Sequence, residues 1–212
     1  KKIADDLKLN EKLVELLFLR GIDNEEAIRR FLYPDVDMFY NPLLMKGMSE
    51  ATARINVAIR NREKIVVYGD YDADGVCSAA ILALFLISRG LDVFVHIPNR
   101  MGDGYGLNTD RLEKIIDQHI PDLIITCDCG ISGANEVRFA LDLGVDMIVT
   151  DHHEVSGEIP ECVVVNPKQS DCGYPCKNLC GAGVALKLVE ALSSRDEMLK
   201  YVDLACVATI AD

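Results

Sequence analysis

The sequence contains no apolar run long enough to cross a bilayer, which takes about 20 consecutive apolar residues. The apolar run over residues 79–87 is short and lies deep in the chain, so it predicts a buried helix rather than a signal peptide. Internal repeats and low-complexity tracts are also absent. With 212 residues, half of them apolar, the chain is long enough to bury a core in one large domain. We therefore expect a soluble protein with no membrane partner.

An excess of basic residues is also missing. The chain has 22 lysine and arginine residues against 34 aspartate and glutamate residues, which gives a net charge of −12. The phosphate backbone of nucleic acid repels such a chain, so nonspecific coating of nucleic acid is excluded. An enzyme whose acidic residues hold metal ions is not excluded, because bound cations reverse the local field.

The eight cysteines lack the pattern of a secreted disulfide scaffold, which is typically short, loop-rich and preceded by a signal segment. Cys127 and Cys206 lie inside apolar runs, which indicates reduced, partly buried thiols in a cytoplasmic protein. Cys172, Cys176 and Cys180 are spaced by four, without the Cys-x-x-Cys pairs and the fourth ligand typical of a zinc site. Their role stays open at this stage.

The hydrophobic pattern divides the chain into two parts. Residues 1–61 have a helical pattern, with one helix ending at Gly21, a second capped by Asn24 and a third over residues 48–61. We expect this part to be an N-terminal lead-in. Residues 62–212 alternate between short β-branched runs and helical patterns, and form the expected catalytic domain.

This alternation predicts an α/β fold with a mostly parallel sheet flanked by helices, because the strands are apolar on both faces. Strands are predicted at residues 65–68, 92–97, 123–127, 146–150 and 163–165. Helices are predicted at residues 76–89, 108–118, 131–143, 183–193 and 198–210. The chain ends in an apolar helix without a polar tail, so we expect it to be the front part of a longer protein.

Acidic residues and histidines follow three of the predicted strands. Asp70 and Asp72 follow the first strand, Asp128 follows the third, and residues 151–153 (Asp-His-His) follow the fourth. Ligands of open parallel sheets bind beyond the carboxyl ends of the strands, so these side chains are expected to converge. Asp212, at the end of an apolar run, is a further candidate.

Carboxylates that converge in this way repel one another unless cations neutralise them. Oxygen ligands suit Mg²⁺, and mixed aspartate and histidine ligands suit Mn²⁺ or Zn²⁺. Two ions that share a carboxylate can activate a water and stabilise the leaving oxygen of a phosphodiester. Gly69 and Gly75 permit a tight turn after the first strand, and the helix near Val76 directs its amides to the same edge, which favours a phosphate. The residues therefore predict a divalent-metal phosphoesterase.

Each of these residues taken alone has a simpler explanation. An aspartate after a strand often caps a helix, and Asp74 is as good an N-cap as a ligand. Gly181 and Gly183, ahead of an apolar helix, could bring backbone amides to a phosphate or let that helix pack closely on the sheet. Arg100, in a glycine-rich loop, could hold a phosphate or tether the loop by a salt bridge. The prediction of a site depends on the combination.

Three motifs resemble the DHH phosphoesterase superfamily, namely residues 69–75 (Gly-Asp-Tyr-Asp-Ala-Asp-Gly), 127–132 (Cys-Asp-Cys-Gly-Ile-Ser) and 151–153 (Asp-His-His). These motifs are most similar to those of the RecJ branch, the single-strand-specific DNA exonucleases. Further RecJ-like sequence segments lie at residues 20–22, 97–100, 104–108, 165–167, 179–185 and 208–212. The resemblance covers nearly the whole chain, including the helical lead-in.

The resemblance implies a metal-dependent exonuclease that uses two ions, Mn²⁺ or Mg²⁺, and digests single-stranded DNA 5′ to 3′ in DNA repair and recombination. The metal ligands that it implies are Asp70, Asp72, Asp128, His152 and Asp212, with Asp74 as a ligand or a supporting group. Asp128 is the implied bridging carboxylate and, with His152, part of the catalytic set. His153 is implied to contact the scissile phosphate or the leaving group. Tyr68 stands where some relatives have histidine, so one metal site is expected to be weaker unless Asp74 compensates.

Relatives of this type carry a C-terminal substrate-binding domain, and RecJ adds an OB-fold, but neither resembles any part of this sequence. We therefore expect three partners, namely single-stranded DNA, DNA-repair proteins and a missing C-terminal domain of the same chain. The fragment alone is expected to be weakly active. Two alternatives stay open. One is a phosphodiesterase for short oligonucleotides or cyclic dinucleotides, and the other is a non-catalytic scaffold of the same fold.

Overall fold

The structure is a computed structural model that describes residues 2–99 and 106–212. The chain divides into two compact units, Lys1–Asn41 and Pro42–Asp212. In the described part of the chain, no helix has both the length and the apolar character needed to span a membrane.

The first unit contains three helices and a short 3-10 helix, namely α1 (Lys2–Leu7), α2 (Glu11–Leu19), α3 (Glu25–Leu32) and η1 (Val36–Met38). Asn10 caps α2 by accepting the amide of Lys12 at 2.9 Å, and Asn24 caps α3 by accepting the amide of Ala27 at 2.9 Å. A small apolar core of its own holds the unit together, formed by Ala4, Val14, Leu17 and Ile28. The helical pattern predicted for this segment agrees with these helices, and its role as a lead-in to the rest of the chain stays a prediction.

The second unit begins with η2 (Pro42–Leu44) and α4 (Met48–Asn61), the helix predicted over residues 48–61. Met48, Ala51 and Ile55 of α4 are buried in the main core of this unit. The boundary predicted between residues 61 and 62 therefore follows a helix that belongs to the second compact unit. The assignment of residues 62–212 as a separate catalytic domain stays a prediction.

The sheet has five parallel strands in the order β2-β1-β3-β4-β5. The strands are β1 (Ile65–Tyr68), β2 (Val93–His96), β3 (Leu123–Cys127), β4 (Asp146–Thr150) and β5 (Val163–Val165). The strand register aligns the carboxyl ends of the strands. Tyr68 at the end of β1 lies beside Thr126 of β3, and Cys127 at the end of β3 lies beside Thr150 of β4. The predicted α/β class with a parallel sheet is confirmed.

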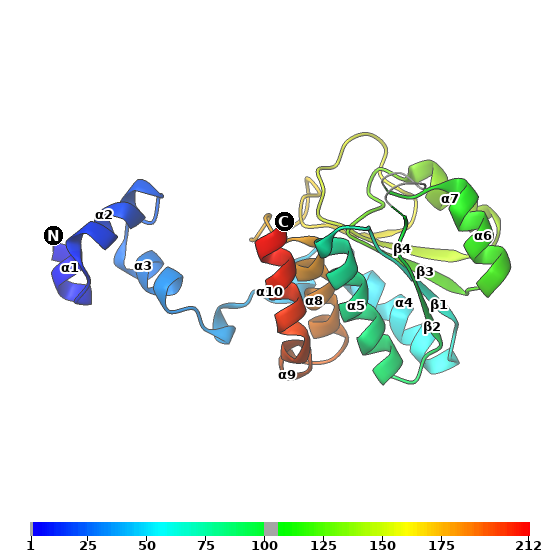
Figure 1. The fold of residues 1–212 in the computed structure, drawn as a ribbon, viewed down its shortest axis with the longest axis horizontal. Coiled ribbons are helices and arrows are strands. Elements are labelled where there is room, and N and C mark those ends of the chain that lie inside the picture. Colours follow the sequence, from blue (N-terminus) through cyan, green and yellow to red (C-terminus); the bar gives the residue numbers. More distant parts are fainter. Residues whose placement is uncertain (1, 100–105) are drawn as a thin grey trace. The chain divides into compact units, whose positions relative to one another are not determined.

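Helices cover both faces of this sheet (Figure 1). The helices of the second unit that follow α4 are α5 (Ala73–Ser88), α6 (Thr109–His119), α7 (Ala134–Asp142), α8 (Gly181–Leu192), α9 (Arg195–Met198) and α10 (Val202–Ala211), with η3 (Leu199–Tyr201) before α10. Ile65 and Val67 of β1 point into the core formed with α4, α5, α8 and α10, whereas Val66 and Tyr68 point into the core formed with α6 and α7. This alternation explains why the strand is apolar throughout.

Four helices begin at places more than one residue from those predicted. The helix α7 begins at Ala134 rather than at residue 131, and α10 begins at Val202 rather than at residue 198. The helix α5 begins at Ala73 rather than at residue 76, because the side chain of Asp72 accepts the amide of Gly75 at 2.9 Å and acts as the N-cap. The alternative of Asp74 as the N-cap is therefore wrong. The helix α8 begins at Gly181, so Gly181 is its first residue rather than part of a preceding loop.

All eight cysteines lie in the described part of the chain and are free thiols. Cys172 and Cys180 are buried in the main core and Cys176 packs against it. Among the described residues, no group of potential metal ligands includes any of these three. Their sulfur atoms fill space in an apolar environment, which is the common use of reduced cysteine.

Candidate metal centre

The predicted site residues lie where the strand order changes direction. The chain passes from β1 to β2 on one side and then crosses to β3 on the other, so β1 and β3 are neighbours at the switch point. Ligands of open α/β sheets bind in the crevice at such a point. Asp70 and Asp72 follow β1, and Asp128 follows β3, so both strand ends at the switch point carry carboxylates.

The turn after β1 depends on a glycine. The backbone of Gly75 approaches Asp70 so closely that a Cβ atom at this position would lie 2.5 Å from the Asp70 nitrogen and 2.6 Å from its Cα. This approach buries Asp70, which is 1% exposed, and its carboxylate accepts the amide of Tyr71 at 2.7 Å. Asp72 stays exposed at the N-cap of α5.

The turn after β3 places Asp128 in the left-handed region, at a φ of 63°. Aspartate tolerates this conformation better than most residues do. The amide of Asp128 still donates to the carbonyl of Thr150 at 3.0 Å, so the residue stays attached to β4 while the chain turns away. Its side chain is 2% exposed.

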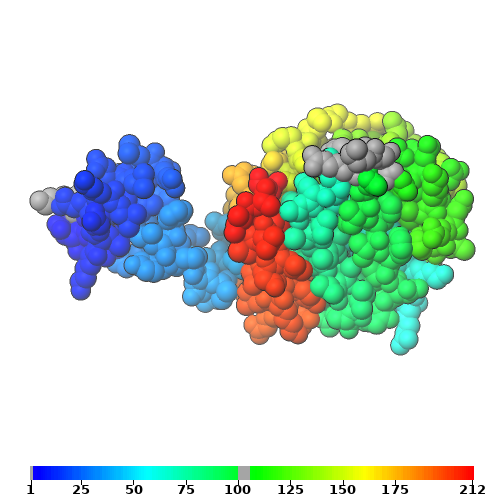
Figure 2. Space-filling view, in the orientation of Figure 1, coloured from blue at the N-terminus to red at the C-terminus, as the bar shows by residue number. Residues whose placement is uncertain are grey.

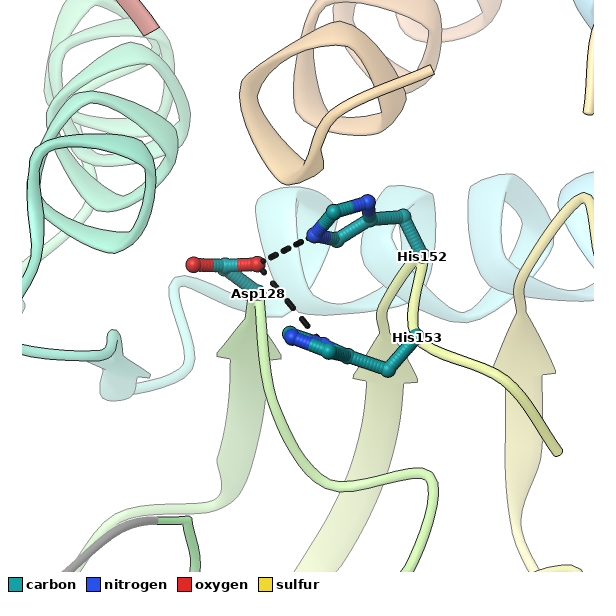
Figure 3. Close-up of side chains that lie close together, drawn as sticks. All are labelled: Asp128, His152 and His153. Carbon is teal, nitrogen blue, oxygen red and sulfur yellow. Dashed lines mark ion pairs between the residues drawn. The ribbon is translucent and has the colours of Figure 1, made fainter. Parts of the chain in front are cut away.

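The two histidines after β4 point toward Asp128 (Figure 3). Nε2 of His152 lies 2.9 Å from Oδ1 of Asp128, and Nδ1 of His153 lies 3.9 Å from the same oxygen. Asp151 fixes this turn, because its carboxylate accepts the amides of His152, His153 and Ile131 at 2.7, 3.0 and 2.8 Å. Oδ1 of Asp151 also lies 2.8 Å from Nδ1 of His153, so any contact of this ring with a phosphate falls to Nε2.

The side chains gather into three overlapping groups that could each hold a metal ion, with one ligand atom per residue and all atoms of a group within 4.8 Å of one another. The groups are Asp70, Asp72 and Asp128; Asp74, His152 and Asp212; and Asp128, His152 and His153. All seven residues predicted as ligands or catalytic residues are therefore brought together. Their individual roles stay predictions.

Burial of several acids together changes their pKa values. Burial raises the pKa of Asp128 to about 7, and the carboxylates of Asp74 and Asp72 add to the effect. Burial likewise raises the pKa of Asp70, with a further increase from Asp72. Burial alone would lower the pKa of His152, but the Asp128 carboxylate outweighs it and the pKa is raised. The bond to Asp151 raises the pKa of His153.

The environment of one buried oxygen, Oδ1 of Asp128, indicates whether a cation fits this cluster. Oδ1 of Asp128 is shielded from solvent and makes no hydrogen bond, although His152 is close. In residues 2–99 and 106–212, the ion-pair partners of Asp74 and Asp128 are histidines, with no lysine or arginine among them. A buried carboxylate oxygen without a donor is costly, and a divalent cation removes that cost. Carboxylates with one or two imidazoles are a donor set that Mn²⁺ accepts, and the all-carboxylate group suits Mg²⁺ as well.

The amides of α8 contact the cluster through Asp74. The carboxylate of Asp74, 2% exposed, accepts the amide of Gly181 at 2.5 Å and the amide of Ala182 at 2.7 Å. The amide of Gly183 donates to the sulfur of Cys180 at 3.4 Å. A phosphate could reach the Gly181 amide only by displacing Asp74, and the substrate-binding roles of Gly181 and Gly183 stay predictions. Arg100 lies outside the described residues.

The structure assigns roles to Asp151 and Tyr68 that the sequence alone does not predict. The sequence places Asp151 only as part of its motif, whereas in the structure its carboxylate orients His153. The available signal was a carboxylate placed directly before two histidines. Tyr68 turns its side chain to the α6–α7 face, and its hydroxyl donates to the carbonyl of Gly106 at 3.2 Å. Because Tyr68 ends β1 and faces the layer opposite to α5 and α8, it cannot serve as a ligand here.

Comparisons with known proteins agree with this geometry. The family described as "DHH family, N-terminal domain" matches residues 64–209. The single-stranded-DNA-specific exonuclease RecJ of Bacillus subtilis is 44% identical over the full length of this chain, which spans 27% of that protein. A crystal structure of exonuclease RecJ bound to manganese has a TM-score of 0.73 and 42% identity, over 79% of this chain and 43% of that one.

A second crystal structure, RecJ from Thermus thermophilus in complex with Mn²⁺, has a TM-score of 0.71 and 37% identity, over 88% of this chain and 28% of that one. The family match covers more than half of the chain and includes both strand ends at the switch point. The chain belongs to the DHH family.

Proposed function

We propose that this chain is the catalytic part of a metal-dependent nuclease that digests single-stranded DNA from an end. The observation that carries the proposal is the convergence of two separate groups of potential ligands on Asp128 and His152, whose side chains lie 2.9 Å apart. The RecJ relatives are single-stranded-DNA-specific exonucleases by name, and two RecJ structures contain manganese. This likeness supports both the substrate and the metal.

In this proposal Asp70, Asp72 and Asp128 would hold one ion, and Asp74, His152 and Asp212 would hold the other. Two Mn²⁺ or Mg²⁺ ions, when bound, supply an activated water and charge stabilisation at the phosphodiester. The buried carboxylates keep their mutual repulsion only while the cations are absent. The protein's contribution is therefore to hold acidic groups at short range before the substrate arrives.

His153 is the group proposed to act on the substrate directly. Its Nδ1 contacts Asp151 at 2.8 Å, and we propose that its Nε2 meets a phosphate oxygen. Asp151 also raises the pKa of His153 and so favours the protonated ring. A protonated ring donates from Nε2 to the scissile phosphate and can give its proton to the leaving oxygen. The side chain is 42% exposed, in contrast to the buried His152, as a contact with substrate requires.

The remaining partners are proposals as well. The chain spans about a quarter of the RecJ protein of B. subtilis, so residues outside it are proposed to grip the single strand. A net charge of −12 disfavours binding of the polyanionic strand by this chain alone. We propose a cytoplasmic enzyme of DNA repair, a location that suits eight free thiols.

The test measures Mn²⁺ binding by the whole protein and then Mn²⁺-dependent release of nucleotides from end-labelled single strands. We expect two bound ions and nucleotide release in the unaltered protein, and a loss of at least about 100-fold in rate in Asp128→Ala. Asp117→Ala is the matched control, because Asp117 is an exposed residue of α6. Absence of metal binding would favour a scaffold, and cleavage of dinucleotides alone would favour a small-substrate phosphodiesterase.

A further inference from the structure

The first turn of α8 contacts two metal-ligand candidates, Asp74 and Asp128, and its N-cap contacts the helix that carries a third, Asp212. Its amides at Gly181 and Ala182 donate to the two oxygens of Asp74, at 2.5 and 2.7 Å. Asp74 lies in the first turn of α5, 107 residues earlier in the chain. Both carboxylate oxygens are thus fixed by one helix end.

Gly181 also touches Asp128. A Cβ atom on Gly181 would lie 2.6 Å from the Cβ of Asp128 and 2.9 Å from its Oδ1, distances that real side chains do not adopt. Asp128, in the turn after β3, belongs to the group with Asp70 and Asp72 and to the group with the two histidines. Because α8 begins with glycine, its axis comes close enough for one residue to contact Asp74 through its amide and Asp128 through its Cα.

The N-cap of α8 also contacts α10, the helix that ends at Asp212. Cys180, the N-cap of α8, has its sulfur 3.4 Å from the hydroxyl oxygen of Thr209 in α10. That hydroxyl also donates to the carbonyl of Ala205 at 2.7 Å. Figure 2 shows α10 beside α5 on the surface of the second unit, so the helices that carry Asp74 and Asp212 run together.

We propose that Gly181 is a positioning residue that sets the separation between the two ligand groups, an inference that rests on the proposed two-metal function. Asp74 lies on α5 and Asp128 lies in the turn after β3, and Gly181 is in contact with both. An added side chain at residue 181 must move either α8 or Asp128. Either movement changes the distance between Asp74, a ligand candidate of one group, and Asp128, a ligand candidate of the other.

This role differs from substrate binding by α8. The Gly181 and Ala182 amides are engaged by a carboxylate, so the charge of the helix end acts on a ligand rather than on DNA phosphate. Groups that hydrogen-bond to a metal ligand tune affinity by about 10- to 100-fold without touching the metal. The effect of changing Gly181 should therefore be visible in metal binding itself, before any substrate is added.

The experiment is a Mn²⁺ titration of the whole protein followed by electron paramagnetic resonance, for the unaltered protein and for Gly181→Ala. The unaltered protein is expected to bind two ions with an exchange-coupled spectrum. In Gly181→Ala we expect one ion to bind about 10- to 100-fold more weakly and the coupled spectrum to be lost. Gly173→Ala is the matched control, because a Cβ there meets only the carbonyl oxygen of Leu44, at 3.6 Å.

Circular dichroism of the metal-free protein separates folding from positioning. If Gly181→Ala fails to fold, Thr209→Val decides, because it keeps the shape of the side chain and removes the contact between α10 and Cys180. Thr209→Val should then weaken the binding of one Mn²⁺ ion and reduce the exchange coupling between the two ions. If Gly181→Ala folds, unchanged Mn²⁺ affinity and an unchanged exchange-coupled spectrum overturn the proposal. If it does not fold, the same result for a folded Thr209→Val protein overturns it. An unaltered protein that binds fewer than two ions overturns the two-metal function instead.

Discussion

Oδ1 of Asp151 lies 2.8 Å from Nδ1 of His153, and the same carboxylate accepts three backbone amides in the turn after β4. The pKa of Asp151 is lowered, because these bonds outweigh the effect of burial. A carboxylate held ionised in this way orients a histidine and stabilises its protonated form. The relationship supports the proposal that His153, rather than His152, acts on a substrate.

The first prediction concerns Asp151→Asn, which removes the charge and keeps the size. We expect the rate constant for nucleotide release to fall by about 100-fold or more, with Mn²⁺ stoichiometry kept, because proton transfer contributes on that order. The pKa of His153 should fall as well, so the alkaline limb of the pH–rate profile should move to lower pH. In a His153→Ala background, Asp151→Asn should cause no further loss of rate, and an additional loss would contradict the role of Asp151.

The second prediction concerns pH and metal affinity. The pKa of about 7 for Asp128 means that a proton competes with Mn²⁺ below neutrality. We expect Mn²⁺ affinity to rise between about pH 6 and pH 8, by up to about tenfold per pH unit for each proton displaced. Because the pKa is raised in the folded state, the metal-free protein should lose stability as pH rises toward 7, so Mn²⁺ should stabilise it more at about pH 8.

Calorimetry in two buffers of different ionisation enthalpy measures the protons released on binding, and thermal melts with and without Mn²⁺ measure the stabilisation. If the affinity for Mn²⁺ and the stabilisation by Mn²⁺ are the same at about pH 6 and about pH 8, Asp128 is excluded as a ligand.

The third prediction concerns the turn after β1. Alanine in place of a helical glycine usually stabilises a protein by about 0.5–1 kcal/mol. At Gly75 the added Cβ would lie 2.5 Å from the Asp70 nitrogen, and overpacking of this kind costs about 1–3 kcal/mol. We therefore expect Gly75→Ala to lower the free energy of unfolding and to weaken Mn²⁺ binding through the displaced Asp70. Denaturant unfolding beside the Gly173→Ala control tests this, and a stabilised Gly75→Ala protein would contradict it.

The fourth prediction concerns Tyr68. The hydroxyl donates to the Gly106 carbonyl at 3.2 Å and is buried on the α6–α7 face. We expect Tyr68→Phe to lower the free energy of unfolding by about 0.5–1.5 kcal/mol, the usual contribution of one hydrogen bond, and to leave Mn²⁺ affinity unchanged. A tenfold loss of affinity in the metal titration would show that Tyr68 supports a metal site after all.

Sequence patterns were sufficient for most of the sheet. The strands β1, β3, β4 and β5 have the predicted bounds, because each is a short apolar run between polar turns and is buried on both faces. Periodicity could not place the start of α5. The run from Asp70 to Asp74 offers three aspartates that could each cap a helix. Packing of Gly75 against the Asp70 backbone selects Asp72.

The candidate site was predicted as a set of residues but not as an arrangement. Carboxylates after strands converge by the rule of parallel sheets, so Asp70, Asp72 and Asp128 could be placed together. Nothing in the local sequence reveals that Asp74 bonds to amides at residues 181 and 182, because that contact joins segments far apart in the chain. The division into ligand groups depends on such contacts.

The group formed by Asp74, His152 and Asp212 has a consequence for folding. It joins the start of α5 to the end of α10, two segments separated by most of the second unit's sequence. A cation held there would act as a reversible crosslink that closes a long loop, and such links restrict the unfolded chain more than the folded one. Protease access to the last turn of α10 would then report how much of the protein carries metal.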